Sequence, residues 1–145
     1  MIGFLLDTNV PSELTEPKSD KRVEQWLEEA DDDQLFLSVI TMGELLKGIT
    51  ILPESKRRRD LQDWVDGKLR KWFDGRILPV SDRIAERWGI LSGECQLLGT
   101  PLNTTDGLIA ATALEHGLIV VTRNTSDFAL AGVKIVNPWL GDTRR

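Results

Sequence analysis

Short runs of apolar residues alternate along this chain with longer segments in which apolar residues recur every three or four positions. The runs predict strands at residues 2–6, 34–39, 118–122 and 133–136, and a short strand or an extended connection at 77–80. The periodic segments between them predict helices. Because the strand runs are continuously apolar, they fit a parallel sheet that is covered on both faces, which is an α/β architecture.

Signals at the segment ends place the predicted helices more closely. A short helix carries Pro11 in its first turn, and longer helices are predicted at about 19–30, 41–52, 55–74, 81–98 and 105–116. Ser19 and Ser81 are predicted N-caps, and Gly117 is the predicted left-handed residue that ends the last helix. An acidic loop is expected between the last two strands. The chain of 145 residues has the size of one domain, with a tail at about 141–145 that is expected to fray.

Composition indicates the cellular compartment in which the protein is expected. The single cysteine, Cys95, cannot form a disulfide within the chain and lies in an apolar helical pattern, so we expect a small buried residue. A reducing cytoplasm is the expected location. The N-terminal apolar run is too short for a secretory signal, and no stretch is long and apolar enough to span a membrane.

The net charge of −5 does not suggest general nucleic-acid binding, yet basic residues crowd one segment. They are Lys56, Arg57, Arg58, Arg59, Lys68, Arg70, Lys71 and Arg76. This segment is either a rim that contacts phosphates or a solvated helix face. The second interpretation is slightly favoured, because acidic residues interleave with the basic ones at Glu54, Asp60, Asp63, Asp66 and Asp74.

Four separate carboxylates stand where strands are predicted to end and helices to begin. Asp7 closes the first apolar run, Glu44 follows the second, Asp106 opens a helical stretch, and Asp127 lies just beyond the run at 118–121. In an open parallel sheet such positions converge outside the carboxyl ends of the strands. Four converging acids repel one another unless a cation lies between them, and oxygen ligands favour Mg²⁺ or Mn²⁺. The pattern therefore predicts a metal-dependent enzyme of phosphoryl transfer.

Each acid also has a structural interpretation. Asp7 could cap the short helix that follows it, although Thr8 or Asn9 could do so as well. Thr41 and Glu44 have the spacing of a capping box, Asp106 suits the first turn of a helix, and Asp127 suits the cap of a short turn. His116, the only histidine, precedes Gly117 at a predicted helix end and is interpreted as structural. One histidine and one cysteine cannot build a usual zinc site, and no glycine-rich phosphate loop is present.

Four segments, residues 5–10, 38–45, 105–113 and 122–128, resemble the PIN-domain ribonucleases, specifically the VapC-type toxins of bacterial type II toxin–antitoxin modules. The segments occur in the family's order, span nearly the whole chain, and look most like the FitB-like and plasmid-stability branch. The resemblance implies a PIN-like three-layer α/β/α fold over residues 1–145.

The same resemblance implies roles for individual residues. Asp7, Glu44, Asp106 and Asp127 match the family's acidic quartet, in which Asp7 and Asp106 are the strongest candidates for metal ligands. Three polar residues match positions that often lie near the site, namely Asn9, Thr122 and Asn124. Asn103 departs from the family pattern, where proline is common, and is expected to loosen the loop before Asp106.

The activity implied by the resemblance is that of an endoribonuclease that uses Mg²⁺ or Mn²⁺ and leaves 5′-phosphate and 3′-hydroxyl ends. It also implies a homodimer and a VapB-type antitoxin partner, through which alone the protein would reach operator DNA. The antitoxin is expected on apolar surface of the early helices, at Trp26, Leu27, Leu46, Ile51 and Leu52, although these residues also fit a plain core.

Two other functions are compatible with parts of the sequence. The segment from Asp7 to Val10 resembles the DxDx[TV] start of haloacid-dehalogenase-like phosphatases, but Asn9 stands where their second aspartate acts as general acid. A PIN scaffold that binds RNA or a partner without cutting it is the second alternative. Retention of all four acids favours the enzyme over both.

Overall fold

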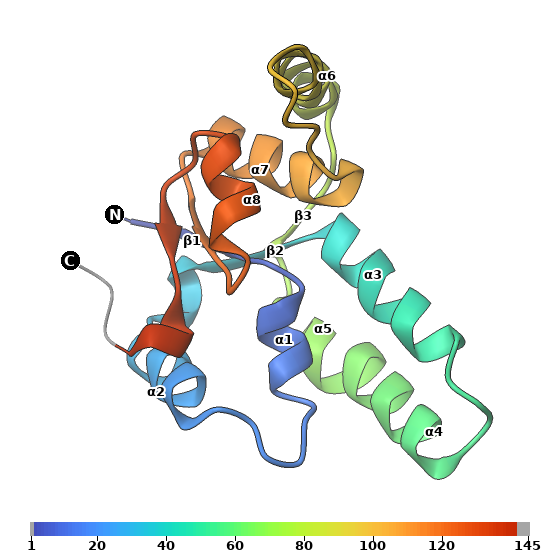
Figure 1. Ribbon diagram of the computed structural model, residues 1–145. Coiled ribbons are helices and arrows are strands. Elements are labelled where there is room, and N and C mark those ends of the chain that lie inside the picture. The colour runs from blue at the N-terminus through green and yellow to red at the C-terminus, as the bar shows by residue number, and fades with distance from the viewer. Residues whose placement is uncertain (1, 142–145) are drawn as a thin grey trace.

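The computed structural model describes residues 2–141 and is built on one parallel sheet. Its strands are β1 (Phe4–Leu6), β2 (Leu35–Ser38), β3 (Ile77–Leu78), β4 (Ile119–Val121) and β5 (Ile135–Val136), in the order β3-β2-β1-β4-β5 (Figure 1). Every neighbouring pair is parallel, which confirms the predicted sheet. The chain builds outward from β1 to β3 and then returns to the other side of β1 with β4. The carboxyl ends of β1 and β4 therefore flank the point where ligands bind in open α/β sheets.

Helices connect the strands and cover the sheet. They are α1 (Asn9–Glu13), α2 (Lys21–Glu29), α3 (Val39–Thr50), α4 (Lys56–Asp63), α5 (Arg70–Trp72), α6 (Asp82–Leu97), α7 (Thr104–His116) and α8 (Thr125–Leu130). Three further turns are η1 (Asp32–Gln34), η2 (Trp64–Leu69) and η3 (Pro138–Leu140), of which η2 is a π-helical stretch that joins α4 to α5. The predicted helix at 55–74 is thus found with a π-helical middle.

Side chains of the strands alternate between two hydrophobic cores, one on each face of the sheet. Phe4 and Leu6 enter the first core with residues of α2, α3, η2 and η3, whereas Leu5 enters the second core with residues of α6, α7 and α8. Both cores consist of side chains that are almost fully buried. The sheet therefore lies between two helical layers, as the three-layer prediction required. Cys95 is buried in the second core, as expected.

Two predicted helix starts are wrong by one to three residues. Asp20, not Ser19, is the N-cap of α2, and its carboxylate accepts hydrogen bonds from the backbone N–H and the guanidinium of Arg22. The helix predicted from 41 begins at Val39, because Ser38 accepts a hydrogen bond from the amide of Ile40. The predicted capping residue Ser81 and the left-handed Gly117, with φ of 66°, are confirmed.

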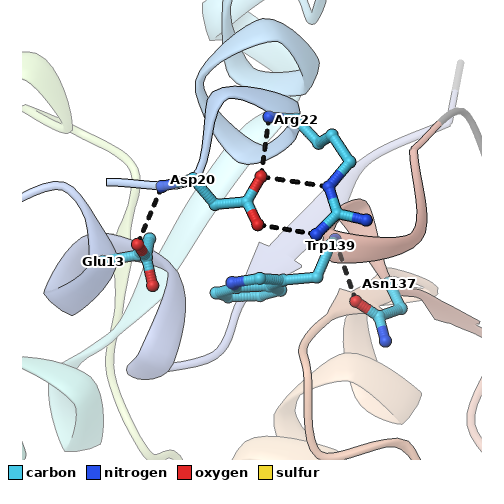
Figure 2. Close-up of polar contacts among 5 residues, drawn as sticks. All are labelled: Glu13, Asp20, Arg22, Asn137 and Trp139. Atoms are coloured by element: carbon cyan, nitrogen blue, oxygen red, sulfur yellow. Dashed lines mark hydrogen bonds and ion pairs between the residues drawn. The ribbon is translucent and has the colours of Figure 1, made fainter. Parts of the chain in front are cut away.

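The start of α2 also anchors the end of the described chain. Figure 2 shows Asp20 between Arg22 and the side chain of Glu13, which accepts from the Asp20 amide at 2.9 Å. Trp139 of η3 lies beside them and is buried, and Asn137 accepts a hydrogen bond from its amide. This packing closes the first core next to α2.

Two other predictions need correction. The acidic loop expected after β4 contains the helix α8, whose Phe128 is fully buried in the second core. Trp26 and Leu27, proposed as partner surface, are core residues instead, whereas Ile51 is 76% exposed. Of the predicted frayed tail, residues 142–145 lie outside the described residues. Within residues 2–141, no helix is long and apolar enough to cross a membrane.

Candidate active site

Asp7 is the innermost of the four predicted acids. It directly follows β1, its amide donates to the carbonyl of Val121, and its side chain is only 5% exposed. Its Oδ2 accepts a hydrogen bond of 2.8 Å from the hydroxyl of Thr122, and its Oδ1 accepts one of 2.8 Å from the amide of Thr8. Hydrogen bonds from strand ends β1 and β4 thus hold this carboxylate in one orientation.

Glu44 lies in the second turn of α3 and is held by a residue of the first strand end. Its Oε1 accepts a hydrogen bond of 2.5 Å from the hydroxyl of Thr8, which also lies 3.3 Å from the hydroxyl of Thr41. Because Ser38 is the N-cap of α3, Thr41 and Glu44 do not form the capping box that was the alternative for Glu44. The carboxylate is turned toward the β1 end instead.

Asp106 and Asp127 come from the first turns of α7 and α8, and one amide joins them. The Nδ2 of Asn124 donates to Asp106 Oδ2 at 3.2 Å and to Asp127 Oδ2 at 3.0 Å. The backbone of Asn124 donates in turn to the hydroxyl of Thr122, which holds Asp7. A continuous set of hydrogen bonds therefore links these two acids to Asp7, and Thr8 joins Glu44 to the same set.

Asn103 does the opposite of what was expected. Its Oδ1 accepts hydrogen bonds from the amides of Thr105 and Asp106 and is the N-cap of α7. The cap fixes the first turn of the helix that carries Asp106, so the expected loosening is wrong. Asparagine is among the best N-cap residues because its side-chain oxygen satisfies amides that the helix leaves unpaired.

The four acids interact electrostatically. Burial, and after it the charges of Asp7, Asp127 and Glu44, together raise the pKa of Asp106 to about 6. Burial also raises the pKa of Asp7, against the hydrogen bonds from Thr122 and Thr8, and the charge of Glu44 adds to the rise. The structure therefore brings all four predicted acids into one field of negative charge, which a bound cation would relieve.

The side chains present fit a weakly held, hydrated divalent cation. Among residues 2–141, no three histidine, cysteine or carboxylate side chains form a ready-made metal cage. Mg²⁺ does not need one, since it usually keeps several waters and binds through one or two carboxylates. The Oδ1 of Asn9 is buried without a hydrogen-bond partner, and its Nδ2 donates to Thr122 at 3.3 Å. Such an oxygen can accept a hydrogen bond from a metal-bound water.

Comparisons with known proteins agree with this geometry. The PIN domain family model matches residues 4–134. The chain belongs to the PIN-domain family. A VapC ribonuclease, Y4jK of Sinorhizobium fredii, is 38% identical over 136 residues, which cover 94% of this chain and 97% of the relative.

Two solved structures are similar to this PIN-domain protein. The crystal structure of FitAcB from Neisseria gonorrhoeae has a TM-score of 0.88 and 37% identity, and the match covers 94% of this chain and 98% of that one. The structure of FitAB bound to an IR36 DNA fragment has a TM-score of 0.90 and 34% identity, covering 98% of this chain and 99% of that one. The PIN-like fold and the resemblance to VapC-type and FitB-like toxins are thereby confirmed.

Thr8 is the residue of this site that the sequence analysis passed over. It was considered only as a helix cap, and it is the N-cap residue of α1, but its side chain makes no capping hydrogen bond. Instead it contacts two acids, Asp7 through its amide and Glu44 through its hydroxyl. Its place directly after Asp7, at the end of a buried strand, was the signal that pointed to this role.

Proposed function

We propose that this PIN-domain chain is a metal-dependent endoribonuclease, the toxin of a type II toxin–antitoxin module, which acts in the cytoplasm. The observation that carries the proposal is the convergence of four carboxylates from four separate elements at one edge of the sheet, held by Thr8, Thr122 and Asn124. The names of the relatives support the same conclusion, because they include VapC ribonucleases and the toxin FitB.

In this proposal Asp7 and Asp106 hold Mg²⁺ or Mn²⁺. An ion bound there would lower the pKa of a water for in-line attack on the phosphodiester and would offset the charge that develops on the phosphate. Thr122 keeps Asp7 in one rotamer, and Asn124 holds Asp106 and Asp127 at a fixed separation. Glu44 and Asp127 would orient waters of the site through hydrogen bonds to their carboxylates. Asn9 contributes its unpaired Oδ1 to the same waters.

The test is RNA cleavage with Mg²⁺, Mn²⁺ or EDTA, by the wild type and by the variants Asp7→Asn and Asp106→Asn. Cleavage that requires the ion and is lost in both variants, with 5′-phosphate ends on the products, supports the proposal. A 2′,3′-cyclic phosphate product refutes the mechanism, because the RNA's own 2′-hydroxyl would then be the nucleophile. Cleavage that survives both substitutions refutes the site assignment.

A partner protein is part of the proposal. A hollow beside α2, η1 and α5 is lined by Leu14, Ala30 and Trp72 and by the acids Glu24, Glu28, Asp31 and Asp32. Apolar walls with an acidic rim suit an amphipathic segment with basic residues, as an antitoxin arm of VapB type would supply. Operator DNA would then be bound through the antitoxin, a view supported by the similar FitAB structure, which holds DNA.

A second copy of the chain completes the proposed assembly. The apolar side chains of Ile90, Leu97 and Leu98 in and after α6 are 65%, 90% and 80% exposed. Figure 1 shows α6 at the periphery of the molecule, away from α1 to α5. Clustered exposed apolar side chains are typical of a protein interface. Sedimentation of the wild type and of the variant Leu97→Glu tests the homodimer, since only the variant should run as a monomer.

The alternative of a binding module without catalysis rests on the absence of a ready-made metal cage among residues 2–141. It predicts RNA binding that does not depend on metal and no cleavage by any variant. The haloacid-dehalogenase-like alternative predicts hydrolysis of p-nitrophenyl phosphate.

A further inference from the structure

Two of the four consecutive basic residues at the start of α4 are paired with nearby acids. Lys56 pairs with Asp60 at 2.6 Å, and Arg58 pairs with Glu54 at 3.2 Å, each with an acid four positions away. Arg57 makes no ion pair and no side-chain hydrogen bond within the part of the chain that the structure describes. Its charge is therefore available to a ligand, unlike the charges on either side of it.

Arg57 faces the proposed active site. It lines a hollow of about 230 Å³ between α1, α3 and α4, whose wall also includes Thr8 and Glu44 of the carboxylate site. Of the described residues that line this hollow, Arg57 is the only cation. The wall also includes a second acid, Glu16, the hydroxyl residues Ser12 and Thr15, and the ring of Trp64.

The substrate that we propose for this protein has an electrostatic requirement that Arg57 meets. A strand of RNA brings a phosphate with each nucleotide, and the carboxylates repel each phosphate that the metal does not neutralise. A guanidinium at the edge of the carboxylate site compensates one of them, and arginine matches phosphate oxygens with two parallel donors. Trp64 adds an aromatic face of the kind on which bases of single strands stack.

We infer that this hollow receives the RNA strand beside the scissile phosphate, and that Arg57 binds the phosphate of a neighbouring nucleotide. This inference rests on the proposed function, because it takes RNA as the substrate. The basic segment is then neither wholly a phosphate-contacting rim nor wholly a solvated face. One of its members binds RNA, while Lys56 and Arg58 keep the helix paired to its own acids.

A protein segment is the competing occupant, since the hollow also has apolar walls at Leu45, Ile49 and Leu61. The charge favours RNA. A peptide would need cations for Glu16 and Glu44 and a separate acidic side chain for Arg57, whereas RNA brings a phosphate to Arg57 with every nucleotide and relies on the metal to offset the acids.

The experiment compares three purified proteins: the wild type, Arg57→Gln and Arg59→Gln. Arg59 is the matched control, because it lies on the same helix, is exposed, and does not line the hollow. Binding of a short single-stranded RNA is measured by fluorescence anisotropy in EDTA, where metal-dependent cleavage does not run. We expect Arg57→Gln to weaken binding about 3- to 10-fold at low salt and to reduce the slope of log K against log salt by about 0.7. Arg59→Gln should remain within about 2-fold of the wild type, as expected for a charge that contacts no phosphate.

A further variant and a kinetic assay keep the inference separate from the proposed function. Arg57→Lys should regain part of the binding, because it restores the charge but not the planar donor pair. In cleavage assays with Mg²⁺, Arg57→Gln should raise KM and leave kcat nearly unchanged. Equal RNA binding by the Arg57→Gln and Arg59→Gln variants overturns the inference, even where the wild type cleaves RNA. Weaker RNA binding by Arg57→Gln alone supports it, even where no variant cleaves and the proposed nuclease fails.

Discussion

Replacing Asp106 with asparagine should abolish the proposed activity and yet stabilise the metal-free protein at neutral pH. The substitution keeps the shape of the side chain and an oxygen that can accept from Asn124, but removes one of four mutually repelling charges. A residue that is retained at a cost in stability is typical of a functional site.

The magnitude follows from the pKa of Asp106, which burial and the neighbouring acids raise from 3.8 to about 6. A difference of about 2 in pKa corresponds to about 3 kcal/mol of folding free energy. Because the side chain is partly exposed, solvent screening reduces this value, and we expect about 1 to 2 kcal/mol. The wild type has its full folding stability below about pH 3.8. It loses about 1 to 2 kcal/mol of this stability as the pH rises through about 6.

The assay is urea or thermal unfolding of the wild type and Asp106→Asn in EDTA, from about pH 4 to about pH 7.5. The variant should unfold roughly 3 to 8 °C higher at the upper pH, and the difference should vanish at the lower pH. Excess Mg²⁺ should raise the unfolding midpoint of the wild type, because the ion binds the carboxylates of the folded state. The difference in stability between the variant and the wild type should then become smaller. A variant that is less stable than the wild type at about pH 7.5, or a gap that does not change with pH, would refute the reasoning.

Three further substitutions test one close packing contact and two helix caps. Gly107→Ala should cost about 1 to 3 kcal/mol in urea unfolding, because its Cβ would lie 2.9 Å from Cδ1 of Trp88, and Trp88→Leu in the same chain should recover part of the loss. Ser38→Ala should cost about 1 kcal/mol by removing the cap of α3, whereas Ser92→Ala, inside α6, should change stability little. Asp20→Ala should lower the melting temperature more than Asp20→Asn, which keeps a capping oxygen. The pKa of Asp20 is lowered to about 2. The folding stability that its charge contributes should therefore be present above about pH 3.8 and be lost as the pH falls toward 2.

The sheet could be predicted from the chain because its strands are short, continuously apolar and buried on both faces. Because the strands are so short, the residues at which they begin and end could not be predicted as well as their existence. The run at 133–136 pairs only at Ile135 and Val136, since pairing depends on where the β4 neighbour ends rather than on local composition. The helix α8 was missed because its only buried residue is Phe128, so the segment has no periodic apolar pattern to detect.

The acids could be placed at the sheet edge because each follows a strand or opens a helix, but their contacts could not be predicted. The hydrogen bond from Thr8 to Glu44 joins residues 36 positions apart, and that from Thr122 to Asp7 joins residues 115 apart. Ser38 and Thr41 are both favoured N-cap residue types, and the choice between them decides whether Glu44 turns back on its helix or toward β1. Tertiary packing decides which residue is the cap. It likewise makes Asn103 the N-cap of α7 rather than part of a loosened loop.

The four acids are held in place by uncharged hydrogen-bond donors. Hydroxyls and amides hold them, at Thr8, Thr122 and Asn124, and no lysine or arginine within residues 2–141 forms an ion pair with any of them. An internal cation would have lowered their pKa values and stabilised the folded chain. Neutral donors fix the same positions and leave the negative charge uncompensated. The raised pKa values of Asp7 and Asp106 are the result, and an external cation that binds there regains the stability that the fold gives up.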